Sequence, residues 1–325
     1  MQRVLDFLKE HGAERVAIFS HVRGDGDCLG AQTGLAEVLS SAGLHVALYN
    51  QDALSDNYCF MTHFDEIEPC TDAAPVPDVC IAVDCANLAR IGTLPDSFLA
   101  RPWINIDHHV SNENFAALNI VEPDASSTCE ILARMTLDAG VVLPKGAATS
   151  FYSGISTDTG SFLYSSAVAK TFYTAAQLLE AGADKSLIQS HFFENTSKKR
   201  VRVLQYLYDN IAYTLDEGVA YAVFSQETQQ ALGASTLDLE GIVSLIREIQ
   251  GVEVAVLFTE MKDGACKISL RSRDWFDCNH LCAAFGGGGH VRASGATFTG
   301  QTLTQAVEAV LEKIAQEWKE NVHAE

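Results

Sequence analysis

The chain has 325 residues, 47% of them hydrophobic and 20% charged, which is the composition of a globular protein of about two domains rather than of a disordered chain. Its formal net charge of −20 argues against binding to duplex DNA, long RNA or an anionic membrane, because those partners are held by Lys and Arg. No apolar stretch approaches the ~18 residues of a membrane span, and the start of the chain lacks the continuous apolar region of a secretory signal.

The first half of the chain alternates strand and helix signals. Short apolar runs that end in polar clusters predict buried strands at 15–21, 44–50, 79–84 and 103–107. Helical patterns follow at 28–42, 126–139, 146–156 and 168–181. This alternation predicts an α/β domain with a doubly wound, mostly parallel sheet over residues 1–190.

The pattern changes around residues 184–210, which are typical of helices with a basic middle. We interpret residues 191–213 as a helical connector between two domains. Residues 214–325 then show strand pairs separated by turns and followed by helices. The turns at Glu217-Gly218 and Asp263-Gly264 predict hairpins. These signals predict a smaller C-terminal α/β domain with a mixed sheet.

Acidic and histidine side chains follow three of the predicted strands, in the segments HVRGDGD, IAVDCAN and NIDHHVSN. A fourth segment, GISTDTG, adds an aspartate in a turn rich in Gly and Thr. The side chains are, in chain order, His21, Asp25, Asp27, Asp84, Asp107, His108, His109 and Asp158. Ligands of parallel sheets bind at the carboxyl ends of the strands, so we expect these groups to lie together.

Carboxylate oxygens and imidazole nitrogens without thiolates suit a divalent ion such as Mn²⁺, with Mg²⁺ as the alternative. More than four such ligands indicate two ions, an arrangement that activates water and clamps a phosphoryl group. Each aspartate taken alone is more typical of a helix N-cap or a turn than of a metal ligand. If there were no metal site, all four segments would have to be helix caps or plain turns at once, so we favour the metal site.

The segment FGGGGHVRASGAT at 285–297 is the second candidate site. Consecutive glycines let backbone N–H groups approach a ligand closely, as in phosphate-binding loops, and basic side chains lie nearby. The candidate substrate-binding residues are Arg271, Arg273, Gly287, Gly288, Gly289, His290, Arg292 and Ser294. They predict capture of a terminal phosphate or a nucleotide. The alternative is a flexible turn with exposed arginines.

Nine cysteines are spread along the chain without a CxxC pair. This pattern disfavours a disulfide framework and a structural zinc site, and it favours free thiols in a reducing cytoplasm. Cys28 lies beside the acidic loop and could be a reactive thiol. Packing as a small apolar side chain is the favoured interpretation.

Together these segments resemble the DHH phosphoesterase family with its DHH-associated C-terminal domain. The motifs that carry the resemblance are HVRGDGD (21–27), VD (83–84), DHH (107–109), STDTG (156–160) and GGGGHVRASG (286–295). They span nearly the whole chain in the family's order. The two-domain length is similar to that of the NrnA-type enzymes of this family, which degrade very short RNA and remove the 3′-phosphate of adenosine 3′,5′-bisphosphate.

The resemblance implies two divalent metal ions in the N-terminal domain. It implies that His21 and Asp25 bind the first ion and that Asp84 bridges the two. The ligands implied for the second ion are Asp27, His108 and Asp158.

The resemblance also implies roles outside the ligand set. Asp107 would orient its neighbours, a role that metal ligands commonly need. His109 would contact the scissile phosphate or assist the leaving group. In the C-terminal domain, Arg271 and His290 would hold substrate phosphate above the glycine loop.

The function implied is that of a metal-dependent hydrolase, an exonuclease-like phosphodiesterase and phosphatase acting on short oligoribonucleotides and on adenosine 3′,5′-bisphosphate. A hydrolase of linear dinucleotides from cyclic-dinucleotide turnover and an inorganic pyrophosphatase are the alternatives among enzymes. A nucleotide-binding regulator without turnover is an alternative of another class, and it would be expected to lack a metal ligand. The sequence does not specify an oligomeric state, and a homodimer is compatible with it.

Overall fold

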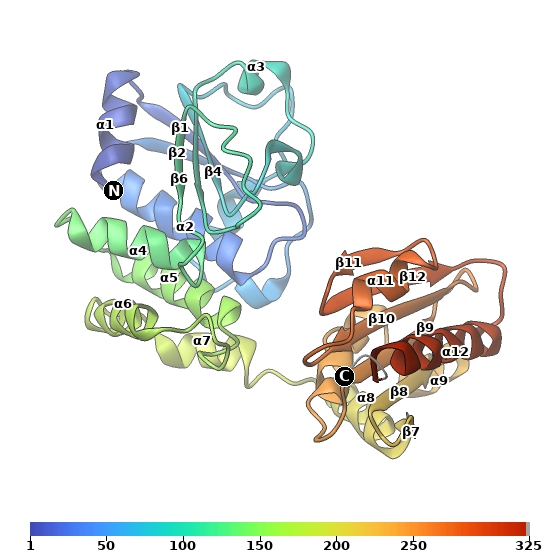
Figure 1. Cartoon of the computed structure of the whole chain (residues 1–325). Coiled ribbons are helices and arrows are strands. Elements are labelled where there is room, and N and C mark those ends of the chain that lie inside the picture. Colours follow the sequence, from blue (N-terminus) through green and yellow to red (C-terminus); the bar gives the residue numbers. More distant parts are fainter. Residues whose placement is uncertain (323–325) are drawn as a thin grey trace. The chain divides into compact units, whose positions relative to one another are not determined.

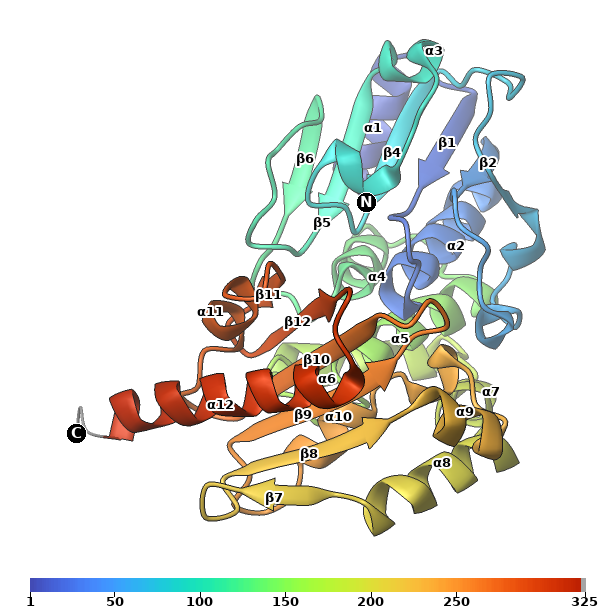
Figure 2. The same cartoon turned by 90° about the vertical axis from the view of Figure 1, so that its right-hand side faces the viewer.

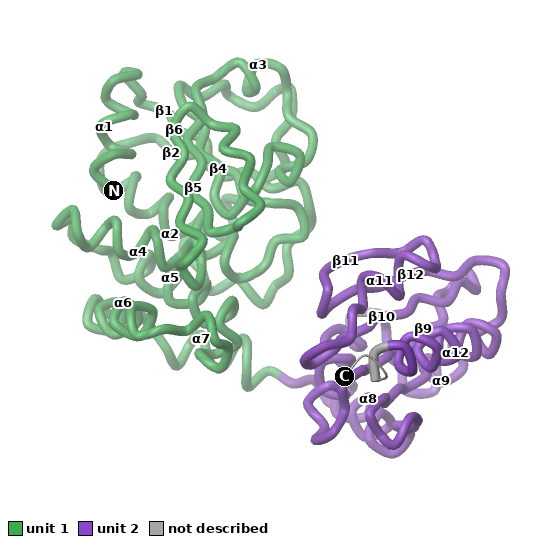
Figure 3. Tube along the Cα trace, in the orientation of Figure 1, with its two compact units in different colours: residues 1–195 green, residues 196–325 purple. Residues whose placement is uncertain are grey.

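The computed structural model describes residues 1–322 of the chain. It divides into two compact units, Met1–Asn195 and Thr196–Glu325, which Figure 3 shows in different colours. Each unit has its own sheet and its own apolar core (Figure 1). None of the helices within residues 1–322 is long and apolar enough to cross a membrane.

Unit 1 is built on one six-stranded sheet whose neighbouring strands all run parallel (Figure 2). Its strands are β1 (Arg15–Phe19), β2 (His45–Tyr49), β3 (Ile67–Glu68), β4 (Val79–Val83), β5 (Trp103–Asp107) and β6 (Leu118–Val121). They lie in the order β3-β2-β1-β4-β5-β6. The chain changes direction across the sheet between β1 and β4, and ligands bind at the strand ends beside such a switch point. The predicted parallel sheet is confirmed.

Apolar side chains cover both faces of this sheet, as expected for a parallel sheet. The helices of unit 1 are α1 (Gln2–Glu10), α2 (Gly26–Ser41), α3 (Asp96–Leu99), α4 (Thr128–Asp138), α5 (Lys145–Asp158), α6 (Ala169–Glu180) and α7 (Lys185–Phe192). In β1, Val16 and Ile18 pack on the side of α1, α2, α4 and α5. Phe19 points to the other side, into an aromatic cluster with Phe98 of α3 and Trp103 of β5.

Helices α2 and α5 pack closely because three glycines on α2 are spaced four residues apart and so share one face. A Cβ atom added at Gly30 would lie 2.5 Å from the carbonyl oxygen of Ser150 on α5. One added at Gly34 would lie 2.5 Å from the ring of Phe151, and one at Gly26 would overlap the side chain of Thr157. The first turn of α2 therefore lies against the end of α5.

Unit 2 contains a second six-stranded sheet, in the order β11-β12-β10-β9-β8-β7. Its strands are β7 (Ala212–Thr214), β8 (Val219–Phe224), β9 (Val254–Glu260), β10 (Cys266–Ser272), β11 (Gly288–His290) and β12 (Ala293–Phe298). Only β8 and β9 pair in parallel among these strands, and the other neighbours are antiparallel. The mixed sheet predicted for the C-terminal region is confirmed.

Two layers of helices enclose the sheet of unit 2. The helices are α8 (Lys198–Asp209), α9 (Gln226–Leu232), α10 (Ile242–Arg247), α11 (Cys278–Ala283) and α12 (Leu303–Val322). Helices α11 and α12 cover the face that carries Val256 and Ile268. On the other face, α8 and α10 pack against Leu257, and α8 contributes Val203 and Leu207 to this core.

The glycine contacts between α2 and α5 predict the effect of a single methyl group. Gly30→Ala should lower the free energy of unfolding of unit 1 by about 1–3 kcal/mol, because the added Cβ meets backbone rather than a mobile side chain. Urea denaturation measures this. Ser40→Ala on the exposed face of α2 is the control and should be near neutral, since alanine favours helix. A Gly30→Ala protein as stable as the control would contradict the close packing.

Candidate metal centre

The acidic and histidine residues of unit 1 meet at the carboxyl ends of the three central strands β1, β4 and β5. His21 lies two residues after β1, and Asp84 directly follows β4. Asp107 is the last residue of β5, and His108 and His109 come next. Because these strands are adjacent and parallel, their ends deliver the side chains to one place.

Two helix ends supply the remaining carboxylates. Asp25 is the N-cap of α2, and its Oδ1 accepts the backbone N–H groups of Asp27 and Cys28 at 3.1 Å each. Asp27 lies in the first turn of α2 and is fully buried. Asp158 is the last residue of α5. The sequence predicted a turn at this aspartate; the helix extends to Asp158, and the turn follows directly at residues 159–160.

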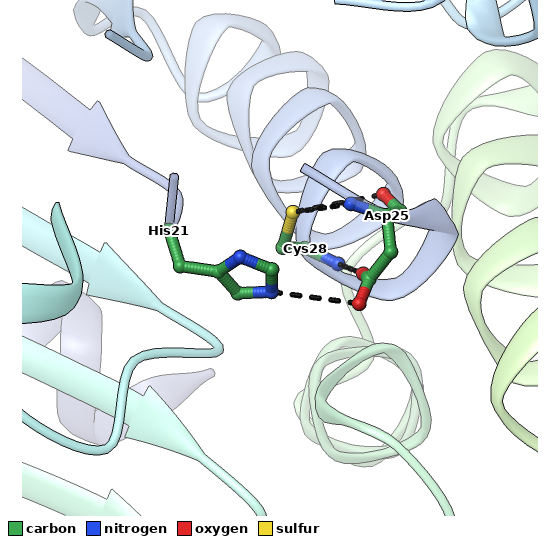
Figure 4. Close-up of side chains that lie close together, drawn as sticks. All are labelled: His21, Asp25 and Cys28. Carbon is green, nitrogen blue, oxygen red and sulfur yellow. Dashed lines mark hydrogen bonds and ion pairs between the residues drawn. The ribbon is translucent and has the colours of Figure 1, made fainter. Parts of the chain in front are cut away.

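Asp84 lies between two groups of side chains. Its Oδ2 is 3.3 Å from His21 Nε2, and that nitrogen is also 3.5 Å from Asp25 Oδ2, a contact drawn in Figure 4. Its Oδ1 is 3.6 Å from His108 Nε2. The Asp84 carboxylate therefore faces His21 with Oδ2 and His108 with Oδ1.

His108 gathers the second group. Its Nε2 is 3.4 Å from Asp158 Oδ2 and 3.9 Å from Asp27 Oδ2. The donor atoms of these three residues all lie within 4.8 Å of one another, as do those of His21, Asp25 and Cys28. The structure thus brings the six metal ligands expected from the sequence into one cluster.

Backbone carbonyls orient both imidazoles. Nδ1 of His21 lies 2.8 Å from the carbonyl oxygen of Val22, and Nδ1 of His108 lies 3.3 Å from that of Ala125. A carbonyl can only accept, so each Nδ1 carries the proton and donates it. Each Nε2 is therefore the ring nitrogen that faces the carboxylates, and it is the nitrogen that would bind a metal in the neutral ring.

Asp107 is fully buried and forms a separate hydrogen-bonded group beside the cluster. Its Oδ1 accepts from His109 Nδ1 at 2.7 Å and from the His108 backbone N–H at 2.9 Å. Its Oδ2 accepts from Asn112 Nδ2 at 2.6 Å. Although burial acts in the opposite direction, these hydrogen bonds keep the pKa of Asp107 below its usual value. An ionised Asp107 therefore fixes the His109 ring.

The cluster holds more negative charge than its own side chains compensate. Burial and the charges of Asp84 and Asp158 raise the pKa of Asp27 well above its usual value. Burial and the charges of Asp84 and Asp25 raise the pKa of Asp158 to about 8. Carboxylates that oppose one another's ionisation fit a bound cation, which would favour the ionised form of each. Oxygen and nitrogen donors in this number suit divalent metal ions.

Two features of the site were not anticipated from the sequence. Thr128, at the start of α4, donates its hydroxyl to Asp84 Oδ1 at 3.0 Å, and its backbone N–H donates to Asp27 Oδ2 at 2.7 Å. The run Ser126-Ser127-Thr128 is typical of a helix start and was the available signal. Asp84 itself has a left-handed backbone with φ of 58°, which is uncommon for a residue other than glycine. Nothing in the local sequence indicates it.

In unit 2 the glycine-rich segment forms a hairpin rather than an open loop, with β11 paired to β12. Gly287 and Gly295 allow close backbone approach, because a Cβ on Gly287 would lie 2.3 Å from the carbonyl oxygen of Gly295. Gly289 has φ of 150°, and a Cβ there would lie 2.6 Å from the carbonyl oxygen of Ala293. The close backbone packing of the hairpin therefore requires these glycines, whether or not they also contact a ligand.

Strand register places Arg271 and His290 in one row on one face of this sheet, on either side of Ala293. Gly288 and Gly295 are paired in a neighbouring row of that face. His290 is exposed, and no carboxylate within residues 1–322 forms an ion pair with Arg271.

The other candidate substrate contacts in unit 2 have partners inside the protein. Arg273 Nη2 donates to the carbonyl oxygens of Arg247 and Ile249, and Arg292 Nη1 donates to that of Phe276. Ser294 is buried, and its hydroxyl donates to the carbonyl oxygen of His290. Arg271 Nη1 donates as well, but to the carbonyl oxygen of its neighbour Leu270, so it does not link distant segments as Arg273 and Arg292 do.

Comparison with known proteins finds two family models. The model of the DHH family, N-terminal domain, matches residues 15–155, and that of the DHHA1 domain matches residues 216–320. The bifunctional oligoribonuclease and PAP phosphatase NrnA of Mycoplasma genitalium is 30% identical over 307 residues, covering 93% of this chain and 94% of the relative. The NrnA of the same description from Thermus thermophilus is 30% identical over 308 residues, covering 93% and 90%.

Among solved structures, the crystal structure of an exopolyphosphatase-related protein from Bacteroides fragilis superposes with a TM-score of 0.87. It shares 31% sequence identity and covers 98% of both chains.

The raised pKa of Asp158 predicts a pH-dependent loss of stability in metal-free protein. Because this carboxyl group has a higher pKa in the folded protein than in the unfolded chain, its contribution becomes destabilising as pH rises from about 4 to about 8. In EDTA at pH 8, Asp158→Asn should raise the Tm by roughly 2–4 °C, or about 1 kcal/mol. At pH 5 the advantage should shrink, because the wild-type group is then protonated.

Asp124→Asn, which changes an exposed aspartate of the same unit, is the control and should leave the Tm unchanged at both pH values. Differential scanning fluorimetry measures all three proteins. A variant at Asp158 that is no more stable than wild type at pH 8 in EDTA would show that the carboxylates do not oppose one another.

Proposed function

The chain belongs to the DHH family of phosphoesterases, and we propose that it hydrolyses short oligoribonucleotides and the 3′-phosphate of adenosine 3′,5′-bisphosphate. The observation that carries the proposal is the position of Asp84 between two groups of metal-binding side chains. The names of its NrnA relatives support these two substrates.

We further propose that the cluster holds two divalent ions, with Mn²⁺ favoured and Mg²⁺ as the alternative. His21 and Asp25 would hold one ion, and Asp84 would be shared. The residues that would hold the other ion are Asp27, His108 and Asp158. When bound, such a pair of ions supplies an activated water and offsets charge on the phosphoryl oxygens.

Side chains around the cluster would contact the substrate or hold the metal-binding residues in position. Asp107 holds His109 Nδ1 at 2.7 Å, and this hydrogen bond raises the pKa of His109 above its usual value. A protonated His109 is suited to contact a phosphate oxygen or to give a proton to the leaving oxygen from Nε2. Thr128 keeps Asp84 in place through its hydroxyl, and the left-handed backbone of Asp84 is held with it.

In unit 2, Arg271 and His290 would bind a substrate phosphate from the same face of the sheet. The paired Gly288 and Gly295 carry no side chains in the neighbouring row, so a ligand could lie against the backbone at these two residues. Arg273 and Arg292, which donate to carbonyl groups of residues distant in the sequence, would act mainly by holding this region in shape, whereas Arg271 donates to its neighbour Leu270.

We also propose a reducing cytoplasm as the location. All nine cysteines are free thiols, and eight of them are buried, which supports a compartment in which disulfides do not form. A homodimer stays compatible with the sequence.

Product analysis tests the proposed activity. A 5′-phosphorylated RNA dinucleotide, a long RNA, adenosine 3′,5′-bisphosphate and pyrophosphate are each incubated with Mn²⁺ and with EDTA. We expect rapid Mn²⁺-dependent hydrolysis of the dinucleotide and the bisphosphate, and slow hydrolysis of the long RNA. Turnover of pyrophosphate alone would contradict the proposal, and so would nucleotide binding without turnover.

Asp84→Asn is the matched inactive variant for that assay. It keeps the shape of the side chain but removes the charge shared by both groups, so kcat should fall by at least about 10²-fold. Circular dichroism should be unchanged. Normal turnover by this variant would exclude a shared ligand at this position.

A second prediction concerns the phosphate contact in unit 2. Arg271→Ala should raise KM for the dinucleotide by roughly tenfold and leave kcat nearly unchanged, because the contact is made to the bound substrate and the transition state alike. Lys262→Ala removes a charge from the exposed turn after β9 and should change neither constant. A loss confined to kcat in Arg271→Ala would rule out a binding role.

A further inference from the structure

Cys28 is a donor group that neither the resemblance nor the proposed function uses. It is fully buried in the first turn of α2, beside two residues proposed to hold an ion. Its sulfur and the donor atoms of His21 and Asp25 all lie within 4.8 Å of one another. Figure 4 shows these three side chains together, with the sulfur on the side of Asp25.

The start of α2 fixes the position of this sulfur. The backbone N–H of Asp25 donates to Cys28 Sγ at 3.2 Å, and the thiol donates to the carbonyl oxygen of Asp25 at 3.6 Å. The same residue's Oδ1 accepts the backbone N–H of Cys28. The Cys28 thiol and the Asp25 carboxylate are therefore held in the same turn at the start of α2. Their donor atoms lie in the same part of the site.

The two halves of the cluster consequently differ in chemistry. The half made by Asp27, His108 and Asp158 offers only carboxylate oxygens and an imidazole nitrogen. The half made by His21, Asp25 and Cys28 adds a sulfur. Oxygen ligands suit Mg²⁺ and Mn²⁺, whereas a thiolate favours softer ions such as Zn²⁺.

We propose that Cys28 Sγ is a ligand of the ion held by His21 and Asp25, so that this position selects a softer ion, such as Zn²⁺, Co²⁺ or Fe²⁺, than its neighbour does. The inference rests on the proposed function, since it requires the two-ion centre. It makes the centre a mixed one, with Mn²⁺ or Mg²⁺ at the oxygen-rich position.

The geometry requires little movement. Ligands at about 2.0–2.3 Å from a Zn²⁺ ion lie roughly 3.5–4 Å apart, so donors within 4.8 Å need to close by no more than about 1.3 Å. Asp84 Oδ2, at 3.3 Å from His21 Nε2, would be the fourth donor, the number that Zn²⁺ usually takes; it lies outside the group of three and would have to approach the ion. On binding, the sulfur lone pair goes to the ion and the thiol proton leaves to solvent.

Cys129 offers a matched comparison. It is also fully buried near the cluster, where its thiol donates to the carbonyl oxygen of Asp27 at 3.3 Å. It belongs to none of the candidate metal-binding groups found within the described residues. A cysteine that packs only as a small apolar side chain should behave as Cys129 does.

Loading with Co²⁺ tests the proposal, because a thiolate bound to Co²⁺ gives a charge-transfer absorption in the near ultraviolet that nitrogen and oxygen ligands do not give. Wild type and Cys129→Ala should bind two Co²⁺ ions and show this band. Cys28→Ala should lose the band and bind Zn²⁺ on the order of tenfold more weakly, while its affinity for Mn²⁺ changes little. Cys28→Ser keeps a polar group facing Asp25 and serves as a second folded variant.

A wild-type protein that binds two Co²⁺ ions without the band overturns this inference and leaves the proposed function intact. A band that persists in Cys28→Ala and Cys28→Ser overturns it as well. A wild-type protein that binds no Co²⁺, Zn²⁺ or Mn²⁺ by equilibrium dialysis overturns both the inference and the two-ion centre on which it rests.

Discussion

Electrostatic repulsion among aspartates is the constraint around which unit 1 is arranged. Asp27 and Asp84 are buried, and burial together with the charges of Asp84 and Asp158 raises the pKa of Asp27. The chain offsets part of this cost with two backbone N–H groups at the start of α4 and with the imidazoles of His21 and His108. Packing elsewhere in unit 1 must compensate for the repulsion that remains. The close contact of α2 with α5 is the clearest example of such packing.

The parts of the site that depend on the sheet could be predicted from the sequence. His21, Asp84 and Asp107 follow apolar runs directly, and parallel strands end at a common edge, so their convergence is a property of the fold class. Asp158 is different. Its place in the cluster depends on how closely α5 approaches α2, which is set by glycines more than a hundred residues away in the sequence. Local patterns contain no such information, and they placed the turn at Asp158 itself, which is the last residue of the helix.

The C-terminal unit shows a second limit of sequence reasoning. The sequence shows four basic side chains around a run of glycines and gives no reason to distinguish them. In the structure they differ in their hydrogen-bond partners and in their position on the sheet. Arg273 and Arg292 donate to carbonyl groups of distant segments, whereas Arg271 donates to its neighbour Leu270 and lies in one row with His290 across paired strands. The glycines, expected as a ligand loop, form a hairpin whose backbones touch. Charge and composition predicted that this region would bind a ligand. Only the strand register shows which of its residues share a face of the sheet.

The two oxygens of Asp25 have separate tasks: Oδ1 caps α2, and Oδ2 faces His21. An ion bound through Oδ2 therefore leaves the helix start intact and holds it against the strand β1. Since such an ion would bind the folded chain and not the unfolded one, it stabilises the fold by mass action. The supply of metal in the cell would then govern how long each molecule survives proteolysis, and not only how fast it works.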